Sequence, residues 1–162
     1  MSFFKIIILF FVVLTKTTNA QDTRLVARVD NVAITNIDLQ KTIEVIKFLK
    51  KDPKISNQSL QNEALKLLID QALQVKFFAL INVDIEDCKK QAVKNGNIEL
   101  KKHDIIEEFA TFYCTQNMWN QIVDSNIRKN YNDVKNISER KKHEESDKLM
   151  KQIRQRFLIE VF

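Results

Sequence analysis

The sequence predicts a mainly α-helical protein of about six helices, with a small antiparallel sheet made by an N-terminal hairpin and a C-terminal strand. The chain of 162 residues contains one glycine and one proline, so it has few of the turn residues that a β-sandwich or barrel needs. Apolar residues recur at helical spacing through most of the chain. Short β-prone runs stand near the two ends, at residues 25–34 and 156–162.

Residues 1–20 have the layout of a secretory signal peptide. Lys5 precedes the apolar run Ile6–Leu14, and small residues follow at Thr18–Ala20 near a cleavage point. The run is well short of the ~20 residues that span a bilayer, although an uncleaved anchor is the alternative interpretation. We therefore expect export, with residues 21–162 forming one domain and no stable membrane insertion after cleavage.

The exported chain would carry a mild basic excess. Without Lys5 and Lys16, 24 basic residues face 21 acidic ones, which gives a net charge of +3. No arginine-rich cluster alternates with aromatic residues, so we expect no nucleic-acid binding.

The first structured segment is expected to be a hairpin followed by a capped helix. Two β-prone runs flank Asp30-Asn31, residue types that tolerate the left-handed conformation of a tight turn. Thr35 is expected to cap the helix, with Asp38 at its third position in a capping-box arrangement. This helix should end shortly before Pro53, because the residue before a proline disfavours the helical conformation.

Four further helices are expected in the middle of the chain. The first, residues 59–80, has so wide an apolar surface that it should lie centrally and mostly buried. The next is expected to start at the N-cap Asp84 and to end at Gly96, which would take the left-handed conformation common after a helix. Two more helices are expected over residues 100–113 and 115–132.

The C-terminal part is expected to be a helix over residues 138–155 and a strand over 156–162. The helix begins with the sequence SERKKHEESD, which is polar on every side, so it should be solvated there and dock only through its later residues. A lone strand leaves its backbone groups unpaired. The strand is therefore expected to pair with the hairpin at residues 25–34, joining the two ends of the domain.

Cys88 and Cys114 are the two cysteines. An oxidising compartment would permit a disulfide. Both positions are helical, however, and a buried thiol also fits them; this second interpretation is favoured, and the pairing stays open. Neither forms a CxxC unit, and no ligand spacing joins them to His103 or His143, so we expect no metal or other cofactor.

The sequence contains no pattern that supports an enzyme. Cys114 and His103 are separated by eleven positions, and no glycine nearby suggests an oxyanion hole. In the doublets Glu107-Glu108 and Glu144-Glu145, neighbouring side chains on a helix diverge by about 100°, which is typical of a solvated face rather than of paired catalytic carboxylates. No catalytic residue is therefore predicted.

Four stretches resemble one family. VARVDNVAITNIDLQKTI, residues 26–43, resembles the opening of the SurA-type periplasmic chaperones, with its hairpin and capped helix. ALKLLIDQALQVKFFALINVDIED, residues 64–87, and MWNQIVDSNIRKNY, residues 118–131, are similar to later segments of the same N-terminal module. KLMKQIRQRFLIEVF, residues 148–162, resembles the family's closing helix and strand.

The chain also departs from that family. Asn82 stands where the family often has a glycine, and Tyr113-Cys114 where it usually has another. Family members commonly carry parvulin-type prolyl isomerase domains before the final helix. Only a few residues separate Asp133 from Ser138, so isomerase activity is not carried over.

The resemblance implies an ATP-independent holdase that binds unfolded or nascent outer-membrane proteins in the periplasm. Such a protein needs an apolar, adaptable groove with a polar rim, and the basic excess would weakly favour acidic clients. Residue type suggests five peptide-binding candidates, although a core position is the competing interpretation of each: Phe77, Phe109, Phe112, Met118 and Trp119. The alternative function is an exported helical adaptor that binds one folded protein. The residues specify neither the client nor the oligomeric state.

Overall fold

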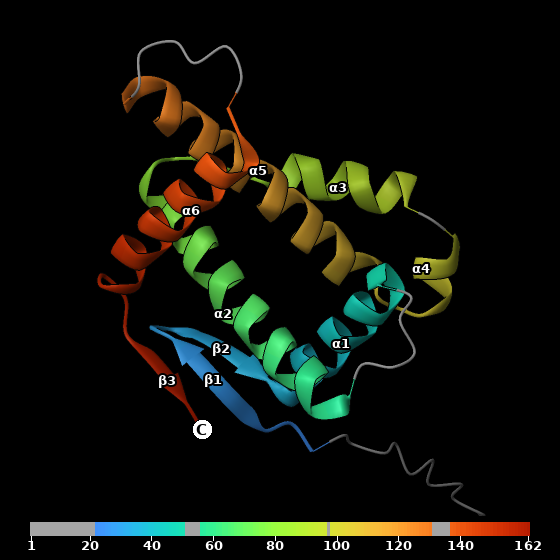
Figure 1. The fold of residues 1–162 in the computed structure, drawn as a ribbon. Coiled ribbons are helices and arrows are strands. Elements are labelled where there is room, and N and C mark those ends of the chain that lie inside the picture. The colour runs from blue at the N-terminus through green and yellow to red at the C-terminus, as the bar shows by residue number, and fades with distance from the viewer. Residues whose placement is uncertain (1–21, 51–55, 97, 131–136) are drawn as a thin grey trace, which may run out of the picture.

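The computed structural model describes residues 22–50, 56–96, 98–130 and 137–162. The predicted signal peptide, residues 1–20, and the predicted helix end before Pro53 lie outside the described residues. Six helices and one three-stranded antiparallel sheet occupy the described part of the chain (Figure 1). The predicted mainly α-helical class with a small sheet is therefore confirmed.

The sheet joins the two ends of the described chain. Strands β1 (Leu25–Val29) and β2 (Val32–Thr35) form the hairpin, and β3 (Ile159–Val161) pairs antiparallel with β1, giving the order β2-β1-β3. Arg28 lies at the centre, opposite Ala33 on one side and Glu160 on the other. The predicted pairing of the C-terminal strand with the hairpin is confirmed.

Asp30 connects the hairpin turn to β3. Its φ of 49° is left-handed, which aspartate tolerates better than most residues. Its backbone N–H donates to the Leu158 carbonyl at 2.8 Å, and the Leu158 N–H donates to Asp30 Oδ1 at 2.8 Å. This second bond, with the ammonium of Lys76 at 3.3 Å, holds the pKa of Asp30 below its ordinary value of 3.8.

Helix α1 (Asn36–Lys50) begins at the predicted capping box. The Asp38 carboxylate accepts from the Thr35 backbone N–H at 2.8 Å and from its hydroxyl at 2.7 Å. In return the Asp38 N–H donates to Thr35 Oγ1 at 3.3 Å. The helix therefore starts directly at the end of β2, which fixes the angle between strand and helix.

Helix α2 (Asn57–Leu80) is central, as predicted, but its wide apolar surface is not buried throughout. Val75 is 40% exposed and Ala79 is also exposed. The difference arises because α2 contacts the sheet, α1, α5 and α6 on different sides along its length. Six α2 residues are buried: Leu60, Ala64, Ile69, Leu73, Gln74 and Phe78.

Three helices follow: α3 (Glu86–Asn95), the short α4 (Ile98–Lys102) and the long α5 (Ile106–Asn130). The predicted helices 100–113 and 115–132 are wrong in their boundaries, because the chain continues as one helix through Tyr113-Cys114. No glycine or proline lies within α5 to interrupt it. The break comes earlier, at Asp104, whose φ of 53° is left-handed.

Gly96 does not take the predicted left-handed conformation. Its φ of −64° and ψ of 151° are extended, so any residue could adopt this backbone. A Cβ atom there would lie 2.1 Å from Ile106 Cδ1, so the Ile106 side chain would have to move to make room for any larger residue. At the other end of α3, Asp84 Oδ1 accepts from the Glu86 N–H at 2.9 Å, although Ile85 occupies the N-cap position itself.

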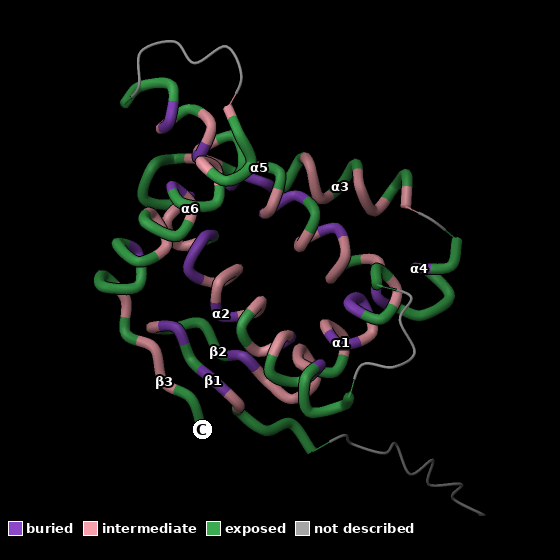
Figure 2. Tube along the Cα trace, viewed as in Figure 1, coloured by how far each residue is buried: buried purple, intermediate pink, exposed green. Residues whose placement is uncertain are grey.

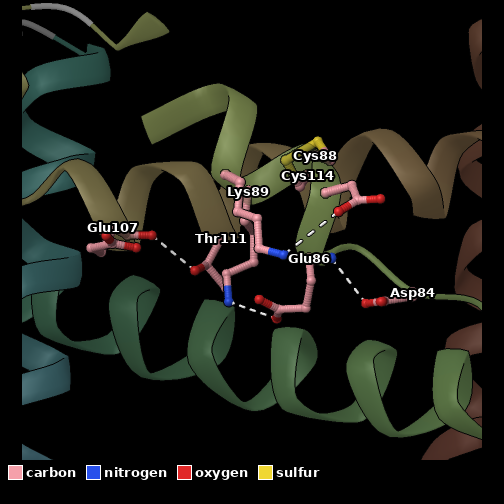
Figure 3. A network of polar contacts seen from close by, with 9 residues as sticks. Asp84, Glu86, Cys88, Lys89, Glu107, Thr111 and Cys114 are labelled. Carbon is pink, nitrogen blue, oxygen red and sulfur yellow. Dashed lines mark hydrogen bonds and ion pairs between the residues drawn. A yellow bond between two sulfur atoms is a disulfide. The ribbon is translucent and has the colours of Figure 1, made fainter. Parts of the chain in front are cut away.

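A disulfide between Cys88 and Cys114 fastens α3 to α5 (Figure 3). The favoured interpretation of two buried free thiols is therefore wrong. None of the ten described residues of α3 is buried, whereas Cys114 is 1% exposed within the core. Because no α3 residue is fully buried, we expect the covalent bond to contribute strongly to the attachment of α3 to α5.

Helix α6 (Glu139–Arg154) docks through polar groups as well as apolar ones. Glu145 is 4% exposed and accepts from Asn126 Nδ2 at 2.5 Å, so the expectation that the doublet Glu144-Glu145 forms a solvated face is wrong at Glu145. The next residue, Ser146, accepts from Trp119 Nε1 at 2.8 Å. The middle of α6 is thus packed against α5 through hydrogen bonds of Glu145 and Ser146, whereas most of its first residues are exposed, as predicted.

The buried apolar residues of the described chain form three clusters. Figure 2 marks where the buried residues lie along the chain. The largest joins the sheet, α2, α5 and α6. A second lies between α1 and α2 around Ile46, and a third joins α1, α4 and the start of α5 around Val45. The adjacent α1 residues Val45 and Ile46 therefore belong to different clusters.

Candidate functional site

An open groove of about 350 Å³ lies where the three core clusters meet. Ile34 of the largest cluster, Ile46 of the second and Val45 of the third all line it. It is bounded by β2, α1, α2 and the first turns of α5. Its apolar lining consists of Val32, Ala33, Ile34, Val45, Ile46, Leu49, Leu67, Leu68, Ala72, Val75 and Phe112.

Several of these apolar side chains remain accessible to solvent. Leu49 is 47% exposed, Val75 40% and Val32 38%, and they belong to three different elements. Contacts with water at apolar side chains are unfavourable, at about 25 cal/mol per Å². The groove is therefore a place where a bound apolar group would gain free energy by displacing water.

The open edge of β2 borders the groove. The N–H of Asp30 bonds to Leu158 beside β3, and backbone groups alternate sides along a strand, so Arg28 also faces β3. Ala33 lies opposite Arg28, and its own N–H and C=O are therefore directed away from β1, toward the open edge. Because Ala33 also lines the groove, backbone donors and acceptors adjoin its apolar surface.

Carboxylates give the groove an acidic rim, which we define as Asp38, Glu107 and Glu108. Glu108 Oε1 pairs with Lys41 Nζ at 2.7 Å, linking α5 to α1. This hydrogen bond, together with the charges of Glu108, Asp104 and Asp38, raises the pKa of Lys41 above its ordinary value of 10.5. The second oxygen of Glu108, Oε2, is buried and has no hydrogen-bond partner among the described residues.

A second, shallower hollow of about 330 Å³ lies between the end of α2, α5 and α6. Phe77 and Met118 line it together with Ile81, which is 42% exposed. Its remaining lining is mixed, with Gln121, Ile122, Ser125, Asn126, Lys129 and Leu149. It is thus more polar than the groove beside β2.

The structure does not bring the five predicted peptide-binding residues together. Phe112 alone of the five lines the groove, whereas Phe77 and Met118 line the second hollow. Phe109 packs edge-on against Phe48 at 6.4 Å between ring centres. Trp119 is 3% exposed and its ring meets that of Phe77 edge-on at 6.3 Å, which places it in the core, as the competing interpretation holds.

Sequence reasoning missed most of the groove because its lining is aliphatic. Leu49 and Val75 stand at helical spacing among other apolar residues, a pattern that is typical of core positions. The wide apolar surface of residues 59–80 is the sequence signal that could have indicated the groove. So wide a surface need not be covered completely by the neighbouring elements. The predicted peptide-binding residues were aromatic residues and a methionine, and most of them lie in α5.

Comparison with known proteins adds no relative: no family model matches the chain, and no curated protein sequence matches it. In the part of the chain that the structure describes, no three histidine, cysteine, aspartate or glutamate side chains are grouped to hold a metal ion. No described helix combines the length and the apolar character that crossing a membrane requires.

Proposed function

We propose that this protein is an ATP-independent holdase that binds unfolded or nascent exported proteins, outer-membrane proteins among them, in the periplasm. The observation that carries the proposal is the apolar groove beside the open edge of β2. An unfolded chain offers both apolar side chains and unpaired backbone groups. The groove supplies a matching surface for each, at one place.

The size of the groove favours an extended segment over a folded partner. A volume of about 350 Å³ accommodates a few side chains. A stable complex of two folded proteins usually buries about 800 Å² on each partner, over a broader surface. The resemblance to SurA-type chaperones supports the same function, and no isomerase activity is proposed.

The test is light scattering of a denatured outer-membrane protein diluted into buffer with and without the purified protein. A several-fold molar excess is expected to delay aggregation. A variant with Leu49→Gln and Val75→Thr should lose most of this effect, because both substitutions make exposed groove positions polar. The fold should survive, since both side chains are already about half exposed.

A matched control carries Leu80→Gln and Val161→Thr, at apolar positions that are 59% and 60% exposed and do not line the groove. This control is expected to delay aggregation as well as the unmodified protein does. An unmodified protein without effect would contradict the holdase proposal. Saturable binding to a single folded protein, without any delay of aggregation, would instead favour the adaptor.

A further inference from the structure

We infer that the groove selects extended segments in which apolar residues are flanked by lysine or arginine, with the cationic side chain held at the acidic rim. This inference rests on the proposed function and names the class of client segment that the groove prefers. It is the opposite of the expectation drawn from the net charge, which favoured acidic clients.

The first observation is the charge of the groove itself. Three carboxylates belong to its lining, and none of the described lining residues is a lysine, arginine or histidine. The chain as a whole carries an excess of basic residues, with a net charge of +5. The local charge therefore opposes the overall charge, and at ionic strengths near 0.1 M only charges within about 10 Å act strongly on a bound segment.

The second observation is that the rim already holds one ammonium group. Lys41 donates to Glu108 Oε1, and nearby carboxylates stabilise its charged form. The rim is thus an environment that favours cations, as Lys41 demonstrates with its raised pKa. The second oxygen of Glu108 has no hydrogen-bond partner among the described residues, so the Lys41 bond does not use the full accepting capacity of this carboxylate; because that oxygen is buried, a client's donor would reach it only if the Glu108 side chain turned toward the groove.

The three carboxylates are not equivalent. Asp38 already accepts two hydrogen bonds from Thr35 in the cap of α1. Glu107 is exposed, and its backbone carbonyl accepts from the Thr111 hydroxyl at 2.8 Å (Figure 3). Both glutamates lie in the first turn of α5, where the helix dipole also favours negative charge. Glu107 and Glu108 are therefore the groups that would receive the client's cation.

The experiment measures binding of three fluorescent decapeptides by anisotropy. All three share the same alternating leucine and serine sequence, and they end in two lysines, two glutamines or two glutamates. At low ionic strength the lysine peptide should bind about tenfold more tightly than the glutamate peptide, with the glutamine peptide between them. The difference should shrink in high salt.

Substitutions test whether the carboxylates of the acidic rim cause the preference for the lysine peptide. Glu107→Gln with Glu108→Gln should reduce the preference to about twofold or less. A control with Glu139→Gln and Glu144→Gln on α6 changes the net charge equally and should keep the preference. Glu107→Gln alone leaves the Lys41–Glu108 pair intact and should lower the preference partly. This single variant keeps the inference testable if the double variant does not fold.

Equal affinity for the three peptides, or a preference for glutamate, would overturn the inference while leaving aggregation suppression by the groove unaffected. A lysine preference that survives in the Glu107/Glu108 variant would overturn it as well. If none of the peptides binds, the inference fails; the light-scattering test then decides separately whether the holdase proposal also fails.

Discussion

Reducing the disulfide between Cys88 and Cys114 is expected to lower the free energy of unfolding by about 3.5 kcal/mol. The two cysteines are 26 positions apart in the sequence. A cross-link that closes a loop of this length removes about 12 cal/mol/K of entropy from the unfolded chain, which gives about 3.5 kcal/mol at 25 °C. For a domain of this size that corresponds to a decrease of about 10–15 °C in the melting temperature.

The folded state offers little to offset this loss. Helix α3 has no fully buried residue, and Ala92, which packs on the core, is only partly buried. Reduction should therefore also free α3 locally, before the rest of the domain unfolds. Hydrogen exchange of α3 amides would show this as faster exchange than in α5.

The assay is thermal unfolding followed by circular dichroism, with and without a thiol reductant. A variant with Cys88→Ser and Cys114→Ala serves as the control, because it should melt near the temperature of the reduced protein and should not respond to reductant. An unmodified protein whose melting temperature is the same in both conditions would refute the reasoning, provided that thiol labelling confirms complete reduction.

Two further predictions concern the packing of the fold. Asp30→Asn and Asp30→Ala should both lower the melting temperature, the alanine variant more because it loses the bond to Leu158 and tolerates a φ of 49° poorly. Since the folded pKa of Asp30 is depressed, its charge stabilises the fold above pH 3.8, and the difference between the unmodified protein and Asp30→Asn should vanish as pH falls through the lower, folded pKa. Gly96→Ala should lower the free energy of unfolding by about 1–3 kcal/mol through overpacking on Ile106. Adding Ile106→Val should recover part of this loss, measured by denaturant unfolding. A double variant as unstable as Gly96→Ala alone would contradict the steric explanation.

The parts of the fold that follow from local chemistry were predictable. The capping box of Thr35 and Asp38 needs only residues three apart, and the structure has it. The pairing of the last strand was predictable for a different reason, since a strand needs a partner and one other β-prone region existed. The left-handed turn at Asp30 follows from the residue type and its place between two strands.

Other features depend on tertiary packing and escaped prediction. The helix break at Tyr113-Cys114 was expected from the spacing of apolar residues, whereas the structure has one continuous helix there. The role of Gly96 depends on the approach of Ile106 from another helix. The groove lies where the three clusters of core residues adjoin. Residue spacing along a single helix does not predict how these clusters are placed relative to one another.

The open edge of β2 connects the fold to the proposed function. β1 is paired on both sides, so the groove borders one of the sheet's two free edges, and helices α1 and α2 line the same groove. This arrangement leaves room for one extended chain while the surrounding helices hinder a second sheet from docking edge to edge.

The same geometry limits how tightly such a chain can be held. β2 has four residues, of which Ala33 directs its backbone groups outward, so a client gains about two hydrogen bonds worth ~1 kcal/mol each. One or two buried apolar side chains add ~1.5–3 kcal/mol each. Association costs at least ~4 kcal/mol, so the net affinity of one segment is weak. Weak, repeated contacts allow release without ATP, and we therefore expect dissociation within about 10 ms or less rather than a stable complex.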